Sequence, residues 1–132
     1  MIMNIVVGND GRTHSEKAAE YAFAYAKAFQ ANLFMLYIVN PKTQEDKEKS
    51  IKNGMRVLGR AKIIASDLGV PLATLLEAGE AHETLLLAAD KLKASALIIG
   101  SSGGKAGMSK LLATSTTDNI MKNSPCTVVV VK

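Results

Sequence analysis

The sequence predicts an α/β domain with a five-stranded parallel sheet and helices on both of its faces. Short apolar runs alternate with helical patterns along all 132 residues, which is typical of successive βαβ units. The predicted strands are apolar throughout, as expected for strands that helices cover on both sides. A hydrophobic content of 48% excludes a disordered chain, and the length suits one domain with its own core.

The strands are predicted from five apolar runs, at residues 4–7, 33–39, 71–76, 94–99 and 126–131. Asn40-Pro41 stops the second run, because proline breaks regular structure and cannot donate a backbone hydrogen bond. No low-complexity segment or internal repeat interrupts the alternation. The chain is therefore expected to fold as a single unit.

Four helices are predicted between these strands, over residues 13–30, 44–68, 81–93 and 116–122. The first begins with a capping box in which Thr13 caps and Glu16 stands three residues on. Gly54 and Gly59 weaken the second helix locally, and Gly69 is placed as its stop. Apolar residues at helical spacing are predicted to face the core: Ala18, Ala22, Ala26 and Phe29 in the first helix, Ile51, Met55, Leu58, Ala65 and Leu68 in the second, and Leu85, Leu86, Ala89 and Leu92 in the third.

The net charge of +4 is mildly basic and suits an anionic ligand. Lysines and arginines of the second helix are mixed with acids, a pattern that we interpret as a solvated face. Nucleic-acid binding usually adds aromatic platforms to a basic patch. Since the chain has no Trp, three Tyr and three Phe, no nucleic-acid partner is expected.

Cys126 is the single cysteine, so it cannot form an internal disulfide. It opens an apolar run, where a small buried residue is a simpler role than a redox thiol. No apolar run approaches the length that a bilayer requires, so no membrane partner is expected. These features together predict a reducing, cytoplasmic setting.

The most informative segment is Gly100-Ser-Ser-Gly103, followed after nine residues by Ala113-Thr114-Ser115. It follows a buried strand and leads to a helix start. Unpaired N–H groups at a helix N-terminus attract anions, and glycine lets an oxyanion approach the backbone. The segment therefore has the parts of a phosphate cradle, although a flexible Gly/Ser loop would have the same composition.

The sequence lacks the residues that several common catalytic and cofactor-binding sites require. His14 and His82 are the only histidines and have no second ligand at metal spacing, which argues against a zinc site. The sequence has no nucleophile elbow, no Walker A loop and no Gly-x-Gly-x-x-Gly after the first strand. A phosphorylation receiver would require an Asp where the third strand ends in Leu75-Leu-Glu-Ala-Gly79, and a flavin carrier would require more hydroxyls and aromatics around Asn9–Thr13.

An adenine nucleotide site remains. In parallel sheets ligands bind at the carboxyl ends of strands where the strand order reverses, and Asp10 and the glycine loop each follow such an end. Asp10 would accept from a ribose hydroxyl or the base, and the backbone of Tyr37–Val39 would face adenine. The glycine loop with Thr114 and Ser115 would hold the phosphates. The alternative for Asp10 is a cap or turn residue before the first helix.

With these residues the sequence resembles the universal stress protein family over essentially the whole chain. The resemblance rests on the run Ile5-Val-Val-Gly-Asn-Asp10-Gly11, the second strand, Gly79, Gly100-x-x-Gly103 and the ending Asn123–Val131. It implies a single domain over residues 1–132 and a doubly wound, Rossmann-like sheet of order 3-2-1-4-5, of the adenine nucleotide alpha hydrolase-like type. The candidate nucleotide-binding residues are Gly8, Asn9, Asp10, Ile38, Gly100, Gly103, Ala113, Thr114 and Ser115.

The resemblance further implies an ATP-binding, stress-response regulatory protein, with Mg²⁺ carried by the nucleotide, at most weak hydrolysis, and a homodimer. The edge strand Thr127–Val131 would form the dimer contact. Ala113 replaces the third glycine of the family's nucleotide-binding pattern, and Arg12 stands where a serine is often seen. Because the family has a branch that does not bind ATP, a nucleotide-free dimeric interaction module is the alternative. No residue resembles a dedicated general base, so the chain is not expected to be an enzyme.

Overall fold

The computed structural model describes residues 2–42, 46–101 and 117–132. Its sheet has five parallel strands in the order β3-β2-β1-β4-β5, which confirms the predicted fold class and strand order. The strands are β1 (Asn4–Gly8), β2 (Asn32–Val39), β3 (Leu72–Ala78), β4 (Ala96–Gly100) and β5 (Thr127–Val131). Their order reverses between β1 and β4, which makes this pair the switch point of the sheet.

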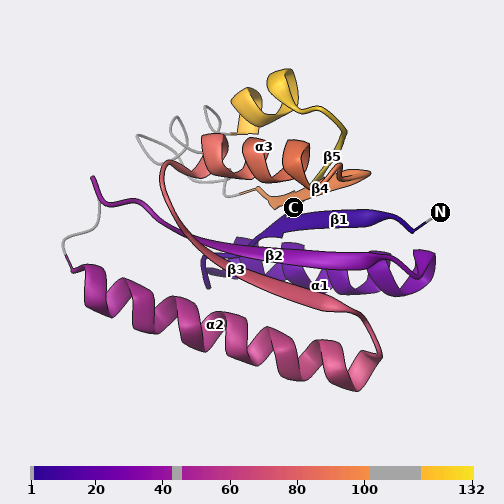
Figure 1. Ribbon diagram of the computed structural model, residues 1–132, viewed down its shortest axis with the longest axis horizontal. Helices are drawn as coiled ribbons and strands as arrows, with labels where there is room; N and C mark the ends of the chain where they lie inside the picture. Colours follow the sequence, from indigo (N-terminus) through magenta and orange to yellow (C-terminus); the bar gives the residue numbers. More distant parts are fainter. Residues whose placement is uncertain (1, 43–45, 102–116) are drawn as a thin grey trace.

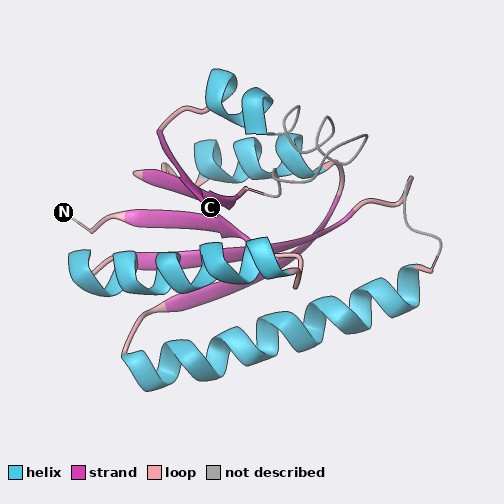
Figure 2. Cartoon of the chain, turned by 180° about the vertical axis from the view of Figure 1, so that it is seen from behind, coloured by secondary structure: helices cyan, strands magenta, loops and turns pink. Residues whose placement is uncertain are grey.

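The helices cover the two faces of the sheet in pairs (Figures 1 and 2). α1 (Thr13–Phe29) and α2 (Lys47–Leu68) pack on one face and share one buried cluster with it. α3 (Ala81–Lys91) and the helical residues 117–123 pack on the other face. β1 and β4 contribute to both clusters, and Ile5, Val6, Leu97 and Ile98 are fully buried.

The inner face of α2 differs from the prediction. Ile51, Met55 and Leu68 are exposed, whereas the buried positions are Gly54, Val57, Leu58, Ala61 and Ala65. A Cβ at Gly54 would lie 2.7 Å from both Leu76 Cδ1 and Tyr37 Cδ1. The helix therefore meets the sheet through small residues, and Gly54 is a packing position rather than the weak point that its propensity indicates.

Two predictions about α1 were also wrong. Arg12 is the N-cap and makes no side-chain cap hydrogen bond, so Thr13 is the first helical residue and the capping box with Glu16 is absent. Phe29 is exposed and stacks on Tyr25, with ring centroids 4.7 Å apart. The predicted stop of α2 is confirmed, because Gly69 adopts a left-handed φ of 72°.

Candidate functional site

The turn between β1 and α1 places Asn9 and Asp10 at the switch point. Asn9 is buried, and its N–H donates to the Leu36 carbonyl at 2.9 Å, which extends the β1–β2 ladder by one residue. Its side-chain Oδ1 accepts from the Gly11 N–H at 2.9 Å, and its Nδ2 lies 3.7 Å from Met35 Sδ. Asn9 is thus a turn-forming residue whose side chain points into the protein rather than toward a ligand.

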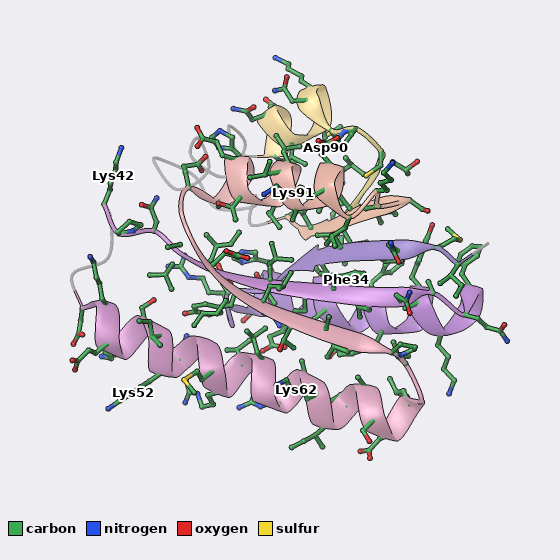
Figure 3. The ribbon with its side chains drawn as sticks, in the orientation of Figure 1. Phe34, Lys42, Lys52, Lys62, Asp90 and Lys91 are labelled. Atoms are coloured by element: carbon green, nitrogen blue, oxygen red, sulfur yellow. The ribbon has the colours of Figure 1, made fainter. Side chains whose placement is uncertain are left out.

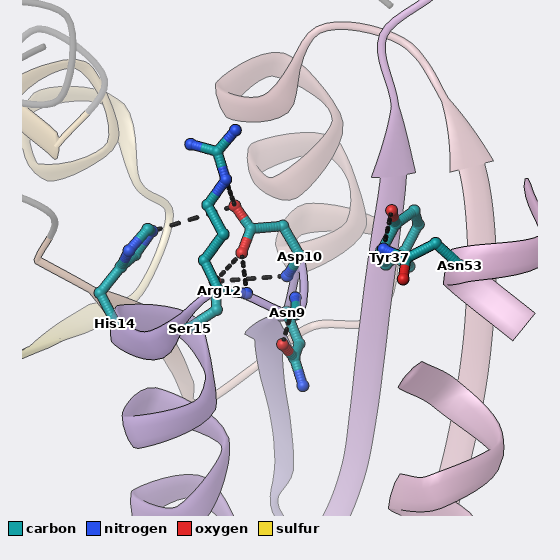
Figure 4. Close-up of polar contacts among 8 residues, drawn as sticks. Asn9, Asp10, Arg12, His14, Ser15, Tyr37 and Asn53 are labelled. Carbon is teal, nitrogen blue, oxygen red and sulfur yellow. Dashed lines mark hydrogen bonds and ion pairs between the residues drawn. The ribbon is translucent and has the colours of Figure 1, made fainter. Parts of the chain in front are cut away.

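Asp10 is half-exposed at the end of this turn (Figure 4). Its Oδ1 accepts from the Arg12 N–H at 2.9 Å and from the Ser15 hydroxyl at 2.7 Å. Its Oδ2 lies 4.0 Å from Arg12 Nε and 3.9 Å from His14 Nε2. One carboxylate oxygen therefore shapes the turn, as the alternative interpretation expects, while the other lies on the solvent side among two side chains that can carry positive charge.

Gly100 brings the end of β4 against the start of α1. A Cβ built at this position would lie 2.3 Å from the His14 carbonyl oxygen and 2.7 Å from its carbon. No side chain fits at such a distance from backbone. Because β1 pairs with β4, Asp10 and the beginning of the glycine segment follow neighbouring strand ends at the same edge of the sheet. The condition for the predicted meeting, that β1 and β4 are neighbours, is met.

Ile38 lies near the end of β2, at the same edge of the sheet. The Leu36 carbonyl accepts from Asn9 on β1, whereas the Val39 carbonyl accepts from Gly79 beyond β3. Backbone groups alternate in direction along a strand, so the N–H and C=O of Ile38 point to the side of β1. β1 has already ended at Gly8 there, which leaves these groups facing the space beyond it.

Gly8 is the last residue of β1. A Cβ at this position would lie 3.2 Å from Leu85 Cδ2 of α3, so the glycine allows α3 to pack closely on the last residue of β1. The remaining site residues of the prediction, Gly103, Ala113, Thr114 and Ser115, lie outside the described residues.

The rim includes residues of α2 that sequence reasoning missed. Asn53 Nδ2 donates to the Tyr37 hydroxyl at 2.8 Å, and Asn53 Oδ1 accepts from Arg56. A Cβ at Gly11, whose φ is 84°, would lie 3.0 Å from Val57 Cγ2. Asn53, which precedes Gly54, thus contacts Tyr37 of β2, and Val57, one helical turn after Gly54, lies against the β1–α1 turn. The one signal in the sequence was Gly54 itself, because a glycine inside a helix often marks a close contact.

Glu80, His82 and Glu83 form the cluster of possible metal ligands found among the described residues. Glu80 is the N-cap of α3, and its carboxylate accepts from the N–H groups of His82 and Glu83 at 3.1 and 3.3 Å. These hydrogen bonds account for the position of the carboxylate as a helix cap. Gly79 precedes it with a φ of 153°, a conformation that favours glycine.

The strand order and the polar β1–α1 turn define a doubly wound α/β domain with polar side chains at its switch point. In the described part of the chain, no helix has the length and apolar character needed to cross a bilayer.

Comparisons with known proteins assign this domain to a family. A model of the universal stress protein family matches residues 1–132, and the chain belongs to that family. A universal stress protein of Methanocaldococcus jannaschii is 29% identical over 138 residues, with 97% of this chain and 81% of the relative covered.

Solved structures of similar fold include proteins with bound adenine nucleotides. A universal stress protein in complex with cAMP has a TM-score of 0.82 and 25% identity, covering 98% of this chain and 97% of that one. The universal stress protein of Archaeoglobus fulgidus in complex with dAMP has a TM-score of 0.75 and 20% identity, covering 100% of both chains. Adenine nucleotides are thus ligands of other members with this fold.

Proposed function

We propose that this protein binds an adenine nucleotide, ATP, at the switch-point crevice and acts as a stress-response regulator in the cytoplasm. The observation that supports the proposal is the placement of Asp10, Ile38 and Gly100 at the carboxyl ends of the neighbouring strands β1, β2 and β4. Relatives of the same fold hold cAMP and dAMP, which supports the choice of an adenine nucleotide.

The described residues suit the nucleoside half of such a ligand. The Oδ2 atom of Asp10 is oriented to accept from a ribose hydroxyl, since its Oδ1 is occupied by Arg12 and Ser15. Adenine carries both donors and acceptors on its edge, which matches the paired N–H and C=O of Ile38. The phosphates would extend toward Ser101 and the glycine segment beyond it, where Mg²⁺ would be held by phosphate and water.

The direct test is mass spectrometry of the native protein for nucleotide retained through purification, followed by calorimetry with ATP, AMP and adenosine. Detection of an adenine nucleotide at near-stoichiometric amount supports the proposal. If the purified protein carries none and ATP at millimolar concentration gives no heat, the nucleotide-free interaction module is the better description.

Ala113 provides a test of whether the glycine segment binds the phosphates of ATP. By the family pattern, a glycine in its place would let phosphate oxygens reach the backbone, whereas an alanine methyl group would hinder that approach. At about 1 kcal/mol, the scale of local backbone strain, this corresponds to roughly tenfold in affinity. Ala113→Gly is therefore expected to tighten ATP binding about tenfold and leave adenosine unchanged, as measured by calorimetry. An equal gain for both ligands would contradict a phosphate role.

We also propose a homodimer through the outer edge of β5. This strand ends the sheet, and an apolar edge invites pairing with a second copy around a two-fold axis. The Val131 carbonyl accepts from the Ser101 N–H at 2.8 Å, so the backbone groups of Val131 and, by alternation, Val129 point inward to β4. Those of Val128 and Val130 point outward.

Val130→Pro should therefore convert the dimer to a monomer while the sheet survives, because it removes an outward N–H that only a partner would use. Val129→Pro is the matched control and should instead destabilise the fold by about 3 kcal/mol, since it removes an inward ladder hydrogen bond. Light scattering and thermal melting distinguish the two variants. A monomeric wild-type protein at micromolar concentration would refute the dimer.

A further inference from the structure

The net charge of the protein is concentrated on α2. This helix carries six basic and two acidic residues, so its own balance of +4 equals that of the whole chain, and the remaining residues hold ten of each sign. All six basic side chains are exposed. They are Lys47, Lys49, Lys52, Arg56, Arg60 and Lys62.

These cations have no internal counterions in the described part of the chain. The ion pairs found there join Arg12 and His14 to Asp10, and His82 to Glu80. Figure 3 shows Lys52 extending from α2 away from the sheet. A row of unpaired cations held on a helix is an electrostatic surface for an anionic partner.

Two large apolar side chains lie among the cations. Met55 and Ile63 are each 65% exposed, which makes them the most exposed apolar residues of α2. They are separated by eight residues, or about 12 Å along the helix axis. Burial in hydrocarbon would give these side chains a contact that neither the sheet nor α1 supplies.

α2 also has the shape and position that an extended surface requires. It is a continuous helix of 22 residues, about 33 Å long, and it forms one outer boundary of the molecule with no element beyond it (Figures 1 and 2). Its other side is fixed by the buried residues Gly54, Val57 and Ala61. The cationic side is therefore presented as a rigid, convex strip.

We propose that the outward face of α2 binds the surface of a membrane that contains anionic lipid. Such a surface contact needs no membrane-spanning segment, so it replaces the expectation from the sequence that the protein has no membrane partner. The positive charge of this face favours an anionic partner. The exposed Met55 and Ile63 favour a partner that has an apolar interior beneath its charged groups. A continuous exposed helix face about 33 Å long suits a flat bilayer better than an acidic peptide. Nucleic acid would leave both apolar side chains without a partner.

The experiment measures co-sedimentation of the full chain with vesicles of phosphatidylcholine alone and of phosphatidylcholine with equimolar phosphatidylglycerol. Binding is expected only to the anionic vesicles. It should be lost between about 0.1 M and about 1 M salt, as the Debye length falls from about 10 Å to about 3 Å. Binding to both vesicle types alike, or to neither, would overturn the proposal.

A charge variant tests the position of the surface. Lys52→Gln, Arg60→Gln and Lys62→Gln combined should weaken binding on the order of 100-fold, at about fivefold for each cation near an anionic surface. The matched control removes three exposed charges elsewhere, Lys91→Gln, Lys122→Gln and Lys132→Gln. It should change binding less than threefold. Equal losses would mean that net charge, and not α2, attracts the protein.

An apolar variant separates a bilayer from other anionic partners. Met55→Gln with Ile63→Gln should weaken vesicle binding about tenfold and leave its salt dependence unchanged. Leu87→Gln with Met121→Gln is the control, because both residues are more than half exposed on the opposite layer. Tighter binding to duplex DNA or polyglutamate, insensitive to Met55 and Ile63, would overturn the assignment to lipid. Circular dichroism melts verify that each variant folds.

Discussion

Gly100→Ala is expected to destabilise the protein by about 3 kcal/mol, at the upper end of the cost of overpacking a core. The added Cβ would lie 2.3 Å from the His14 carbonyl oxygen. A backbone atom cannot move to another rotamer, so α1 and β4 would have to separate. The melting temperature should fall on the order of 10 °C, and the proposed nucleotide site beside these two elements should bind more weakly as a result.

Gly59→Ala is the matched control, because a Cβ there meets nothing within 4 Å. Alanine in an exposed helix interior is favoured over glycine by about 1 kcal/mol, so this variant should be more stable than wild type. Urea unfolding should show a lower midpoint than wild type for Gly100→Ala and a higher midpoint for Gly59→Ala, although both substitutions add one methyl group. A wild-type midpoint for Gly100→Ala would contradict the close packing of β4 on α1.

Asp10→Ala should weaken ATP and adenosine alike by roughly 30-fold, which corresponds to about 2 kcal/mol for a hydrogen bond to a charged group. The loss is equal for both ligands because Asp10 is proposed to contact the nucleoside and not the phosphates. Gly103→Val, in contrast, is expected to weaken ATP far more than adenosine. Calorimetry with both ligands measures the difference.

Asp10→Asn distinguishes binding from turn formation. Its Oδ1 can still accept from the Arg12 N–H and the Ser15 hydroxyl, which hold the turn at present, but the negative charge is lost. If the carboxylate binds ribose, the Asn variant loses affinity nearly as the Ala variant does. If Asp10 only shapes the turn, the Asn variant binds nucleotide like wild type. Glu20→Ala, at an exposed carboxylate of α1, is expected to change nothing.

The inner face of α2 illustrates where sequence patterns stop. Periodicity assigns the large side chains Ile51 and Met55 to the core because apolar residues usually face inward. The structure instead buries Gly54 and Ala61, since small residues let the helix lie close to Tyr37 and Leu76 of the sheet. The face of α2 that turns inward depends on the shape of the sheet surface against which it packs. The sequence of the helix alone does not specify that shape. Because Gly54 and Ala61 face the sheet, Met55 lies on the exposed side of the helix together with the lysines.

The Asp10 turn shows a similar division. Its residue types predict a turn or cap, and the hydrogen bonds to Arg12 and Ser15 confirm a turn. The predicted capping box at Thr13 and Glu16 was wrong because the N-cap is Arg12, one residue earlier. The Asp10 turn fixes the position of Arg12. A local motif is ambiguous by one residue until the preceding loop is positioned.

The sequence by itself determined the alternation of strands and helices, the parallel sheet, and the chain positions that supply the crevice. Strands that are apolar on both faces are typical of a parallel sheet covered by helices on both sides. Glycines and polar residues after the strands indicate the edge of the sheet where ligands bind in such folds. Only the tertiary structure decided that Gly100 packs against the His14 backbone, that α2 meets the sheet through Gly54 and Ala61, and that Met55 is therefore exposed. These properties arise from distances between elements remote in sequence, and local residue patterns carry no information about such distances.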